Sequence, residues 1–560
     1  MIAKSLNIII LISVISAAGI SIPAHAESTA DIPHFEDKGT AKQLIVDGKP
    51  FIILGGELHN SSSSSLAHME PVWDKLKGMN LNTVITPVFW ELIEPVEGQF
   101  DFSIVDGLLE GAREHDLKLV LLWFGSWKNA VSSYVPAWVK TDDRRFPRVK
   151  NIEGESREVL SCFGAESLKA DSRAFAEFMK HLAEVDGDDR TVIMVQVENE
   201  TGLLGDSRDR STAAKKAFRA QVPPELIAYL SAHKKTLIPE MLEIWAGSGF
   251  AESGTWQEVF GSDADEVFMA WHLGSYIGAV GTAGKAEYQL PLFVNAWLVQ
   301  DGFSKPGEYP SGGPVSKMMD VWRAAAPVFE LYAPDIYDPA FKAVCERYVR
   351  SGNPLFIPEA HRDFSAVPKT FYTIAEHDGI GFSPYGIDEA VENHPLEETY
   401  RLFSDIMPLI AEHQGTGNMV GFMETDESAR TVELGDYILE IDYDMFGKGN
   451  AKSYGLIIAL APDEFLMAGS GFWVTFLPKP GNKNRVGILT ADECWYKDSL
   501  WTYGRRLNGD GNDGGLRAQF LYVDFSGTPR ELSLSSGFMP PMPVSPNNFT
   551  LQRIKLYTYK

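Results

Sequence analysis

One run of nine residues, VIMVQVENE at positions 192–200, carries the first clue to how this chain folds. Its apolar, β-branched beginning is typical of a strand in a parallel sheet that is covered on both faces. Its last residue, Glu200, puts a carboxylate at the C-terminal end of that strand. The run PLFIPE at positions 354–359 repeats the pattern and ends in Glu359. Because residues that follow parallel barrel strands gather at one mouth, the two glutamates are expected to meet.

Runs of this kind occur eight times and alternate with helical patterns. They are found at residues 51–55, 82–86, 118–123, 192–198, 291–295, 333–336, 355–358 and 379–383. The alternation predicts a parallel sheet covered by helices, and eight units close a (β/α)8 TIM barrel, an α/β fold. Ahead of the first strand, Asp47-Gly48 predicts a hairpin turn. The interval from 203 to 290 is too long for an ordinary crossover and predicts a helical insertion near the barrel mouth.

The pattern changes after about residue 416. From there on, short alternating runs are separated by Gly, Pro and Asn, as at residues 437–443, 472–476 and 554–558. This pattern predicts an antiparallel β-sandwich or jelly roll. We therefore expect a barrel over residues 27–416 and a C-terminal β-sandwich domain over residues 417–560.

Residues 1–26 have the pattern of a secretory signal peptide. A short basic start precedes an apolar core, and Ala24-His25-Ala26 fits the small-x-small cleavage rule. The apolar core is short for a membrane anchor, and no later stretch approaches the length of a spanning helix. We expect cleavage near Ala26 and a secreted or periplasmic protein that has no membrane partner.

Charge and cysteine content narrow the class of protein further. The formal net charge of −26 repels nucleic acid and anionic lipid, so neither is expected as a partner. Cys162, Cys345 and Cys494 cannot all form disulfides with one another. Three buried free thiols are favoured, and a single disulfide between two of them is the alternative. No zinc or phosphate motif occurs, and the Asn- and Gly-rich run at 508–512 lacks the glutamate of a calcium loop. No cofactor is therefore expected, and a homodimer stays open.

Two carboxylates from different barrel strands suit the cleavage of a glycosidic bond. One attacks the anomeric carbon as an anion, and the other starts protonated and gives its proton to the leaving oxygen. Asn199, directly before Glu200, can hydrogen-bond the sugar 2-hydroxyl. The alternative for either glutamate is an acid that merely begins the following helix.

Three motifs carry a resemblance to a known family. QVENETG at 196–202 resembles the Q-x-E-N-E-x-G signature of glycoside hydrolase family 35, the β-galactosidases. WELIEPVEGQFDF at 90–102 and PAW at 136–138 are similar to further elements of that family. The resemblance implies a TIM barrel in which Glu200 is the acid/base and Glu359 the nucleophile, and the β-rich tail resembles a bacterial branch. It implies a retaining, exo-acting β-galactosidase that releases terminal galactose from plant-type oligosaccharides.

The chain departs from the family at two positions that usually contact galactose. Pro87 stands where members often carry tyrosine, and Trp127-Lys128-Asn129 stands where they often carry Asn-Ala-Glu. Another barrel glycosidase, such as a β-glucosidase or arabinopyranosidase, therefore stays open beside the β-galactosidase. A carbohydrate-binding protein without catalysis is the alternative outside enzymes.

Eight residues are candidates for contacts with the sugar, because they follow the predicted strands. Tyr337 either donates a hydrogen bond to the nucleophile or is an ordinary interfacial tyrosine. Core packing is the alternative for the tryptophans, and solvated loop ends are the alternative for the polar residues. His59, after the first strand, is expected to be structural. The candidates are Asn199, Glu91, Trp90, Trp127, Asn129, Asn295, Trp297 and Tyr337.

Overall fold

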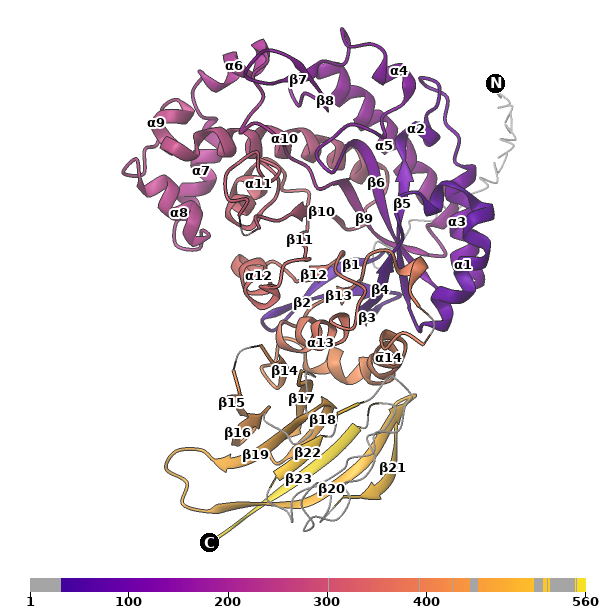
Figure 1. Ribbon diagram of the computed structural model, residues 1–560, viewed down its shortest axis with the longest axis vertical. Helices are drawn as coiled ribbons and strands as arrows, with labels where there is room; N and C mark the ends of the chain where they lie inside the picture. The colour runs from indigo at the N-terminus through magenta and orange to yellow at the C-terminus, as the bar shows by residue number, and fades with distance from the viewer. Residues whose placement is uncertain are drawn as a thin grey trace, which may run out of the picture.

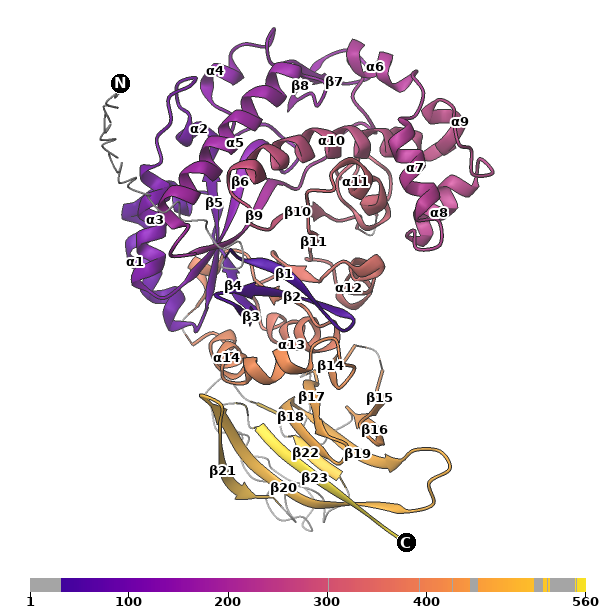
Figure 2. The ribbon, with the colours of Figure 1, turned by 180° about the vertical axis from the view of Figure 1, so that it is seen from behind.

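A computed structural model describes residues 32–560 except 301, 392, 426, 444–451, 508–516, 521, 524–548 and 550. The predicted signal peptide and the run at 508–512 lie outside the described residues. Figure 1 shows an α/β body in the upper half of the molecule and a β domain below it, and Figure 2 shows the same arrangement from behind.

The upper body is the predicted barrel. Its strands are parallel and neighbour one another in chain order, and a backbone hydrogen bond of 2.9 Å from Ile336 N to Glu359 O joins the last pair around the circle. The strands are β4 (Ile53–Glu57), β5 (Thr83–Phe89), β6 (Lys118–Lys128), β9 (Val192–Asn199), β10 (Leu292–Trp297), β11 (Leu331–Asp335), β12 (Phe356–Ile357) and β13 (Gly381–Phe382). All eight fall where the sequence predicts them, and every residue of β5 and β9 is buried, as the apolar runs require.

Helices cover the outside of the barrel. In α3 the buried residues Val105, Leu108, Leu109 and Ala112 follow the spacing of one helix face, and that face packs on the strands. The barrel helices are α1 (Leu66–Gly78), α2 (Trp90–Ile93), α3 (Ser103–Glu114), α4 (Ala137–Lys140), α5 (Ala165–Asp186), α10 (Ala264–Glu287), α11 (Met319–Ala325), α12 (Phe341–Tyr348), α13 (Ala366–Phe371) and α14 (Leu396–His413). A short hairpin of β7 (Arg148–Lys150) and β8 (Ser156–Leu160) lies beside the third strand.

The long interval between β9 and β10 is helical. It holds α6 (Thr212–Phe218), α7 (Pro224–Ala232), α8 (Pro239–Ala246) and α9 (Trp256–Phe260) ahead of α10. Gly284 of α10 lies against Phe175 and Met179 of α5, so these two long helices pack side by side. The added helices are therefore α6 to α9, and α10 is the covering helix of an ordinary crossover.

A three-stranded sheet closes the N-terminal end of the barrel. It consists of β1 (His34–Lys38), β2 (Ala41–Val46) and β3 (Lys49–Phe51). Asp47 and Gly48 both have positive φ, 52° and 70°, as a tight hairpin turn requires. Leu44 and Val46 of β2 join the apolar interior of the barrel. With that end covered, only the opposite end, where the strands finish, is left for a site.

The C-terminal domain is an antiparallel β-sandwich, as predicted. One sheet has the order β14 (Met419–Met423), β17 (Tyr454–Ala461), β18 (Glu464–Ser470), β23 (Leu551–Tyr559), β20 (Arg485–Lys497) and β21 (Leu500–Arg506). The other has the order β15 (Ala429–Leu434), β16 (Tyr437–Asp442), β19 (Phe472–Pro478) and β22 (Arg517–Phe520). Phe472 and Phe520 stack in the core with ring centroids 4.4 Å apart, and the edge of Phe422 from the first sheet meets Phe472.

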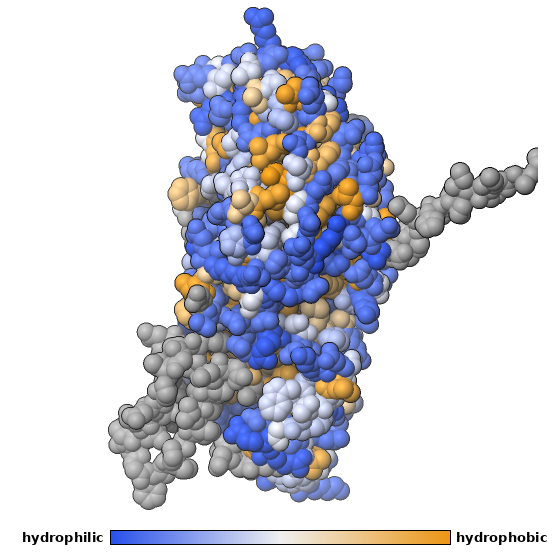
Figure 3. Space-filling view, turned by 90° about the vertical axis from the view of Figure 1, so that its right-hand side faces the viewer, coloured by the Kyte–Doolittle hydropathy of each residue, from blue (hydrophilic) through white to orange (hydrophobic). Residues whose placement is uncertain are grey.

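The sandwich and the barrel share an apolar interface. Phe371 of α13 contacts Phe403 of α14 and Tyr454 of β17, at centroid distances of 4.9 and 5.3 Å. The three cysteines are free thiols, as favoured from the sequence, with Cys345 and Cys494 buried and Cys162 partly so. Within the described residues, no helix has the length and apolar content to cross a membrane. Figure 3 shows a largely hydrophilic face, in keeping with the acidic composition, with apolar side chains gathered on its upper half.

Candidate active site

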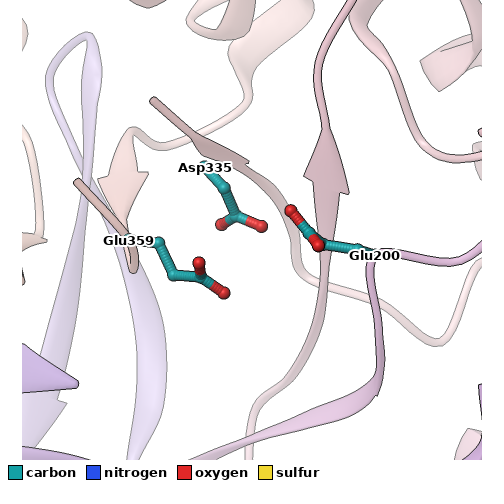
Figure 4. Close-up of side chains that lie close together, drawn as sticks. All are labelled: Glu200, Asp335 and Glu359. Atoms are coloured by element: carbon teal, nitrogen blue, oxygen red, sulfur yellow. The ribbon is translucent and has the colours of Figure 1, made fainter. Parts of the chain in front are cut away.

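Glu200 and Glu359 meet at the C-terminal mouth of the barrel. Glu200 follows β9, the fourth barrel strand, and Glu359 follows β12, the seventh. Together with Asp335, the last residue of β11, each offers a carboxylate oxygen that lies within 4.8 Å of the others. Figure 4 shows the three carboxyl groups turned toward one another. Only 6 %, 3 % and 5 % of Glu200, Asp335 and Glu359 are exposed, so the cluster lies at the bottom of the mouth.

The backbone around Glu200 is strained. Glu198 and Glu200 have φ values of 63° and 44°, in the left-handed region that residues with a Cβ rarely adopt. The register of β6 against β9 shifts between Trp123 and Lys128, which is a bulge beside the site. Asn295 Oδ1 accepts the backbone N–H of Glu200 at 2.8 Å and so holds this conformation. Strain of this kind is typical of residues whose side chains must be aimed at a ligand.

A cavity of about 350 Å³ opens above the carboxyl groups. This volume suits one sugar ring with part of its neighbour. The lining combines acids, amides and aromatic rings, the groups that bind hydroxyls and stack on sugar faces. The lining residues are Asn60, Lys128, Asn129, Glu200, Trp297, Gln300, Asp335, Tyr337, Glu359 and Tyr385.

Glu200 is poised to carry a proton at neutral pH. Its burial, and next the charge of Glu359, raise the pKa of Glu200 to about 8, while the Lys128 ammonium acts in the opposite direction. The side-chain amide of Asn129 donates a hydrogen bond to Glu200 Oε2. A carboxylic acid with this pKa can act as a general acid at neutral pH.

Glu359 is surrounded by hydrogen-bond donors. The hydroxyl of Tyr337 donates to Oε2 at 2.9 Å, which is the first of the two alternatives that the sequence left open. The side-chain amide of Asn199 lies 3.5 Å from Oε1, a long contact. Burial raises the pKa of Tyr337, so its hydroxyl remains a donor throughout the accessible pH range. These two contacts hold the carboxyl group of Glu359 in place beside the cavity.

Two further acids at the site, Glu57 and Asp335, are not among the site residues predicted from the sequence, although Glu57 is recognisable there as following the first strand. Burial raises the pKa of both Glu57, at the end of β4, and Asp335, and the charge of Glu359 adds to this. Asp335 Oδ2 accepts the side-chain amide of Asn295 at 2.7 Å, whereas Asp335 Oδ1 and Glu57 Oε1 have no partner among the described residues. Both acids end barrel strands, so the rule that singled out Glu200 could have found them.

The three clustered carboxyl groups are the one set of described side chains arranged closely enough to hold a metal ion. Oxygen ligands suit magnesium or calcium. The raised pKa values of Glu200 and Asp335 keep protons on these groups, however, and Lys128 adds a positive charge beside them. The arrangement therefore suits proton transfer better than cation binding.

The predicted sugar contacts divide into three groups. Asn129, Trp297 and Tyr337 line the cavity. Asn199 and Asn295 lie behind it, and each bonds a carboxyl group of the site. His59 pairs with Asp388 at 3.0 Å and is structural, as expected.

The other three candidates do not line the cavity, and the structure corrects those predictions. The indole N–H of the buried Trp90 donates to Glu94 Oε2 at 2.9 Å. Trp127 is buried edge-on against Tyr276 with a centroid distance of 4.7 Å. Glu91 pairs with Lys140 at 2.9 Å. Because the chain turns into α2 directly after Phe89, Trp90 and Glu91 are carried away from the mouth.

Solved structures of barrel enzymes resemble the fold at low sequence identity. The catalytic domain of a β-amylase from Paenibacillus polymyxa matches with a TM-score of 0.44 and 14 % identity, over 61 % of this chain and 93 % of that one. A β-galactosidase from the psychrophilic Marinomonas ef1 matches with a TM-score of 0.42 and 13 % identity, over 64 % of this chain and 60 % of that one.

Comparisons of the sequence point to a particular enzyme family. A β-galactosidase of Xanthomonas manihotis is 32 % identical over 203 residues, which make up 35 % of this chain and 31 % of the relative. The chain thus matches less than a third of that relative's length. Residues 396–519 match a domain of unknown function, DUF5597. Residues 43–241, which contain Glu200 and all three sequence motifs, match the model of glycosyl hydrolases family 35, and the resemblance of the chain to this family is thereby confirmed.

Proposed function

We propose that the protein is a retaining, exo-acting glycoside hydrolase, and that its activity is that of a β-galactosidase. The observation that carries the proposal is the approach of carboxylate oxygens of Glu200 and Glu359 to within 4.8 Å. Retaining enzymes hold their two carboxyl groups about 5–5.5 Å apart, while inverting enzymes leave roughly 6.5–9.5 Å for a water molecule. The short separation therefore favours a double displacement.

In the first step, a carboxylate oxygen of Glu359 attacks the anomeric carbon, and the bond from that carbon to the leaving oxygen breaks. Glu200 gives its proton to the leaving oxygen, so the aglycone departs as a neutral alcohol. The pKa of about 8 on Glu200 keeps this proton available at neutral pH. The Tyr337 hydroxyl, 2.9 Å from Glu359 Oε2, orients the attacking carboxylate.

In the second step, Glu200 is an anion and takes a proton from water as the water attacks the same carbon. The ester bond to Glu359 breaks, the sugar leaves with its original anomeric configuration, and Glu200 is protonated again. Asn199, the last residue of β9, has its side-chain amide toward Glu359, where a sugar 2-hydroxyl would be within its reach.

Galactose is the sugar that the proposal favours. Its support is the named activity of the Xanthomonas relative over the barrel segment. The cavity of about 350 Å³ is closed below by the barrel core, which suits removal of a terminal residue, and plant-type oligosaccharides are the proposed source. Pro87 and Lys128 differ from the usual galactose-contacting pattern, so arabinopyranoside and β-glucoside are the competing substrates to test.

Export to the periplasm or medium is part of the proposal, since the first 26 residues have a signal-peptide pattern. N-terminal sequencing of the protein from its native compartment should begin near Glu27. A mature protein that retains residues 1–26 would contradict export by cleavage.

The central test uses a panel of aryl β-glycosides with the purified protein. Fastest hydrolysis of the β-galactoside is expected, with a product that keeps the β configuration when followed by NMR. A 2-fluoro galactoside should inactivate the enzyme and label Glu359, as peptide mass spectrometry would reveal. Labelling elsewhere, an inverted product, or sugar binding without turnover would overturn the proposal.

A further inference from the structure

Two consecutive residues at the end of β6 hold two consecutive residues at the end of β9. The Lys128 ammonium donates to Asn199 Oδ1 at 2.8 Å, and the Asn129 amide donates to Glu200 Oε2. Backbone bonds of 3.2 Å from Asn129 N to Asn199 O and from Ala130 N to Glu200 O keep the two segments in register. The pair Lys128-Asn129 therefore forms a clamp on Asn199 and the proposed acid.

Lys128 determines which way the amide of Asn199 faces. An ammonium group has only donors, whereas a side-chain amide has an accepting oxygen and a donating nitrogen. With Oδ1 held by Lys128, the Nδ2 group is directed toward Glu359, whose Oε1 lies 3.5 Å away. If the amide were reversed, its Nδ2 group would face the Lys128 ammonium, and its Oδ1 would face the carboxylate of Glu359. Both contacts would be unfavourable, because the first joins two donors and the second joins two acceptors.

The position of Lys128 is itself well defined. Only 5 % of the residue is exposed, and its ammonium lies 5.1 Å from the centre of the Phe124 ring. The ammonium lies close enough to Glu57 and Glu200 to lower the pKa of both carboxyl groups. A buried ammonium with such neighbours keeps one orientation, in contrast to a lysine at the surface.

We propose that Lys128 is a positioning residue for recognition of the sugar 2-hydroxyl. It acts through Asn199, whose amide it holds with the donating end toward the 2-hydroxyl oxygen, and the hydroxyl in turn donates to Glu359. The inference rests on the proposed function, because it needs a glycoside in the cavity. It also assigns a role to one of the positions at which this chain departs from the family pattern.

The first test replaces Lys128 and compares two substrates. The quantity measured is the ratio of kcat/KM for an aryl β-galactoside to that for its 2-deoxy analogue. In Lys128→Met this ratio should fall about tenfold or more relative to the wild type, the size expected when a hydrogen bond tied to a charged group is lost. Lys369→Met, which removes a buried lysine of α13 that is not among the cavity-lining residues, should leave the ratio unchanged.

A double-mutant cycle separates positioning from general damage to the site. Asn199→Ala should lower the ratio by itself, and Lys128→Met should then have no further effect on it. Circular dichroism verifies folding, and Lys128→Leu, which also lacks a donor, serves if Lys128→Met does not fold. A ratio that stays at the wild-type value in either active Lys128 variant, or additive effects in the cycle, would overturn the inference.

The pH profile provides a second readout that lost packing alone would not move. The charged and titratable groups around Glu200 are Glu57 at the end of β4, Lys128 at the end of β6, Asp335 and Tyr337 at and just after the end of β11, and Glu359 after β12. Lys128 is the cation among them and lowers the pKa of Glu200.

In Lys128→Met the alkaline limb of kcat/KM should therefore move to higher pH, and an unmoved limb would contradict the inference. The wild-type enzyme separates the two proposals. If it hydrolyses no glycoside of the panel, the proposed function fails and the inference with it. If it is active and only the variant results disagree, the inference alone fails.

Discussion

The barrel mouth and the β-sandwich use burial in opposite ways. At the mouth, Glu57, Glu200 and Asp335 are buried together with few donors, and their pKa values are raised. In the sandwich the buried core is apolar, with Phe472 stacked on Phe520, and acids such as Glu493 pair with arginine near the surface. The Arg505 side chain lowers the pKa of Glu493.

This contrast separates chemistry from stability. Crowded buried acids destabilise a fold, so they are tolerated where a reaction needs a proton held at neutral pH. An apolar core with paired surface charges stabilises the fold and has no such chemistry. Substitutions at the mouth should therefore change rates, and substitutions in the sandwich should change stability.

The largest effect is expected from the two proposed catalytic residues. Glu200→Gln should lower kcat by roughly 10²- to 10⁴-fold because the general acid is lost, and Glu359→Gln should lower it at least as much. Steady-state kinetics on an aryl β-galactoside measure the loss of kcat. Thermal unfolding measures stability, and both variants should unfold at the temperature of the wild type.

Glu91→Gln is the matched control for this prediction. Glu91 is also an acid after a barrel strand, but it pairs with Lys140 outside the cavity lining, and its loss should leave kcat nearly unchanged. Near-full activity in either catalytic variant would contradict the assignment of roles.

A substitution in the core of the sandwich should lower the free energy of unfolding and leave the rate of catalysis unchanged. Phe472→Ala is expected to lower the free energy of unfolding by about 3–5 kcal/mol, because a large buried ring leaves a cavity. Denaturant unfolding followed by circular dichroism measures this loss, while kcat at a temperature below unfolding should stay at the wild-type value. A large fall in kcat in the folded variant would mean that the sandwich takes part in the reaction.

The pH dependence of activity comes next in size. Glu200 must be protonated at the start of each turnover, and its pKa is raised to about 8. The value of kcat/KM should therefore fall about tenfold for each pH unit above 8, once the acid is ionised. A profile measured with the β-galactoside tests this, and an alkaline limb near pH 5 would show that Glu200 is not the acid.

The smallest effects concern stability as a function of pH. The pKa of Glu57 is raised on folding, so the folded state binds more protons, and stability is lost as the pH rises from the ordinary glutamate value through the raised one. Glu57→Gln removes this loss, and the variant should melt higher than the wild type at alkaline pH but not at pH 4.

Glu493→Gln is the opposite case. The pKa of Glu493 is lowered by Arg505, so its stabilisation is present at neutral pH and is lost as the pH falls through that lowered value. The variant should melt slightly lower than the wild type at pH 7 and equally in acid. Calorimetry over this pH range measures the change in melting temperature of both variants relative to the wild type. Changes of the same sign in Glu57→Gln and Glu493→Gln would contradict the difference between mouth and sandwich.

The sequence was sufficient for the architecture. The apolar runs before Glu200 and Glu359 lie where strands form, and the Asp47-Gly48 turn adopts the positive φ that those residue types favour. Such features are local, because periodicity and turn chemistry act over a few residues. The same locality explains the errors: Trp90 and Glu91 directly follow a barrel strand, but the turn into α2 takes them out of the mouth.

What the sequence by itself determined is the set of eight strands, the sandwich, and the two glutamates at strand ends. Only the tertiary structure decided which groups meet at the site: that Asp335 joins the two glutamates, that Glu57 lies near enough to Glu359 to feel its charge, that Lys128 holds Asn199, and that Trp127 turns into the core. The physical reason is that a pKa and a hydrogen bond depend on neighbours across the barrel, and strands far apart in the chain supply them.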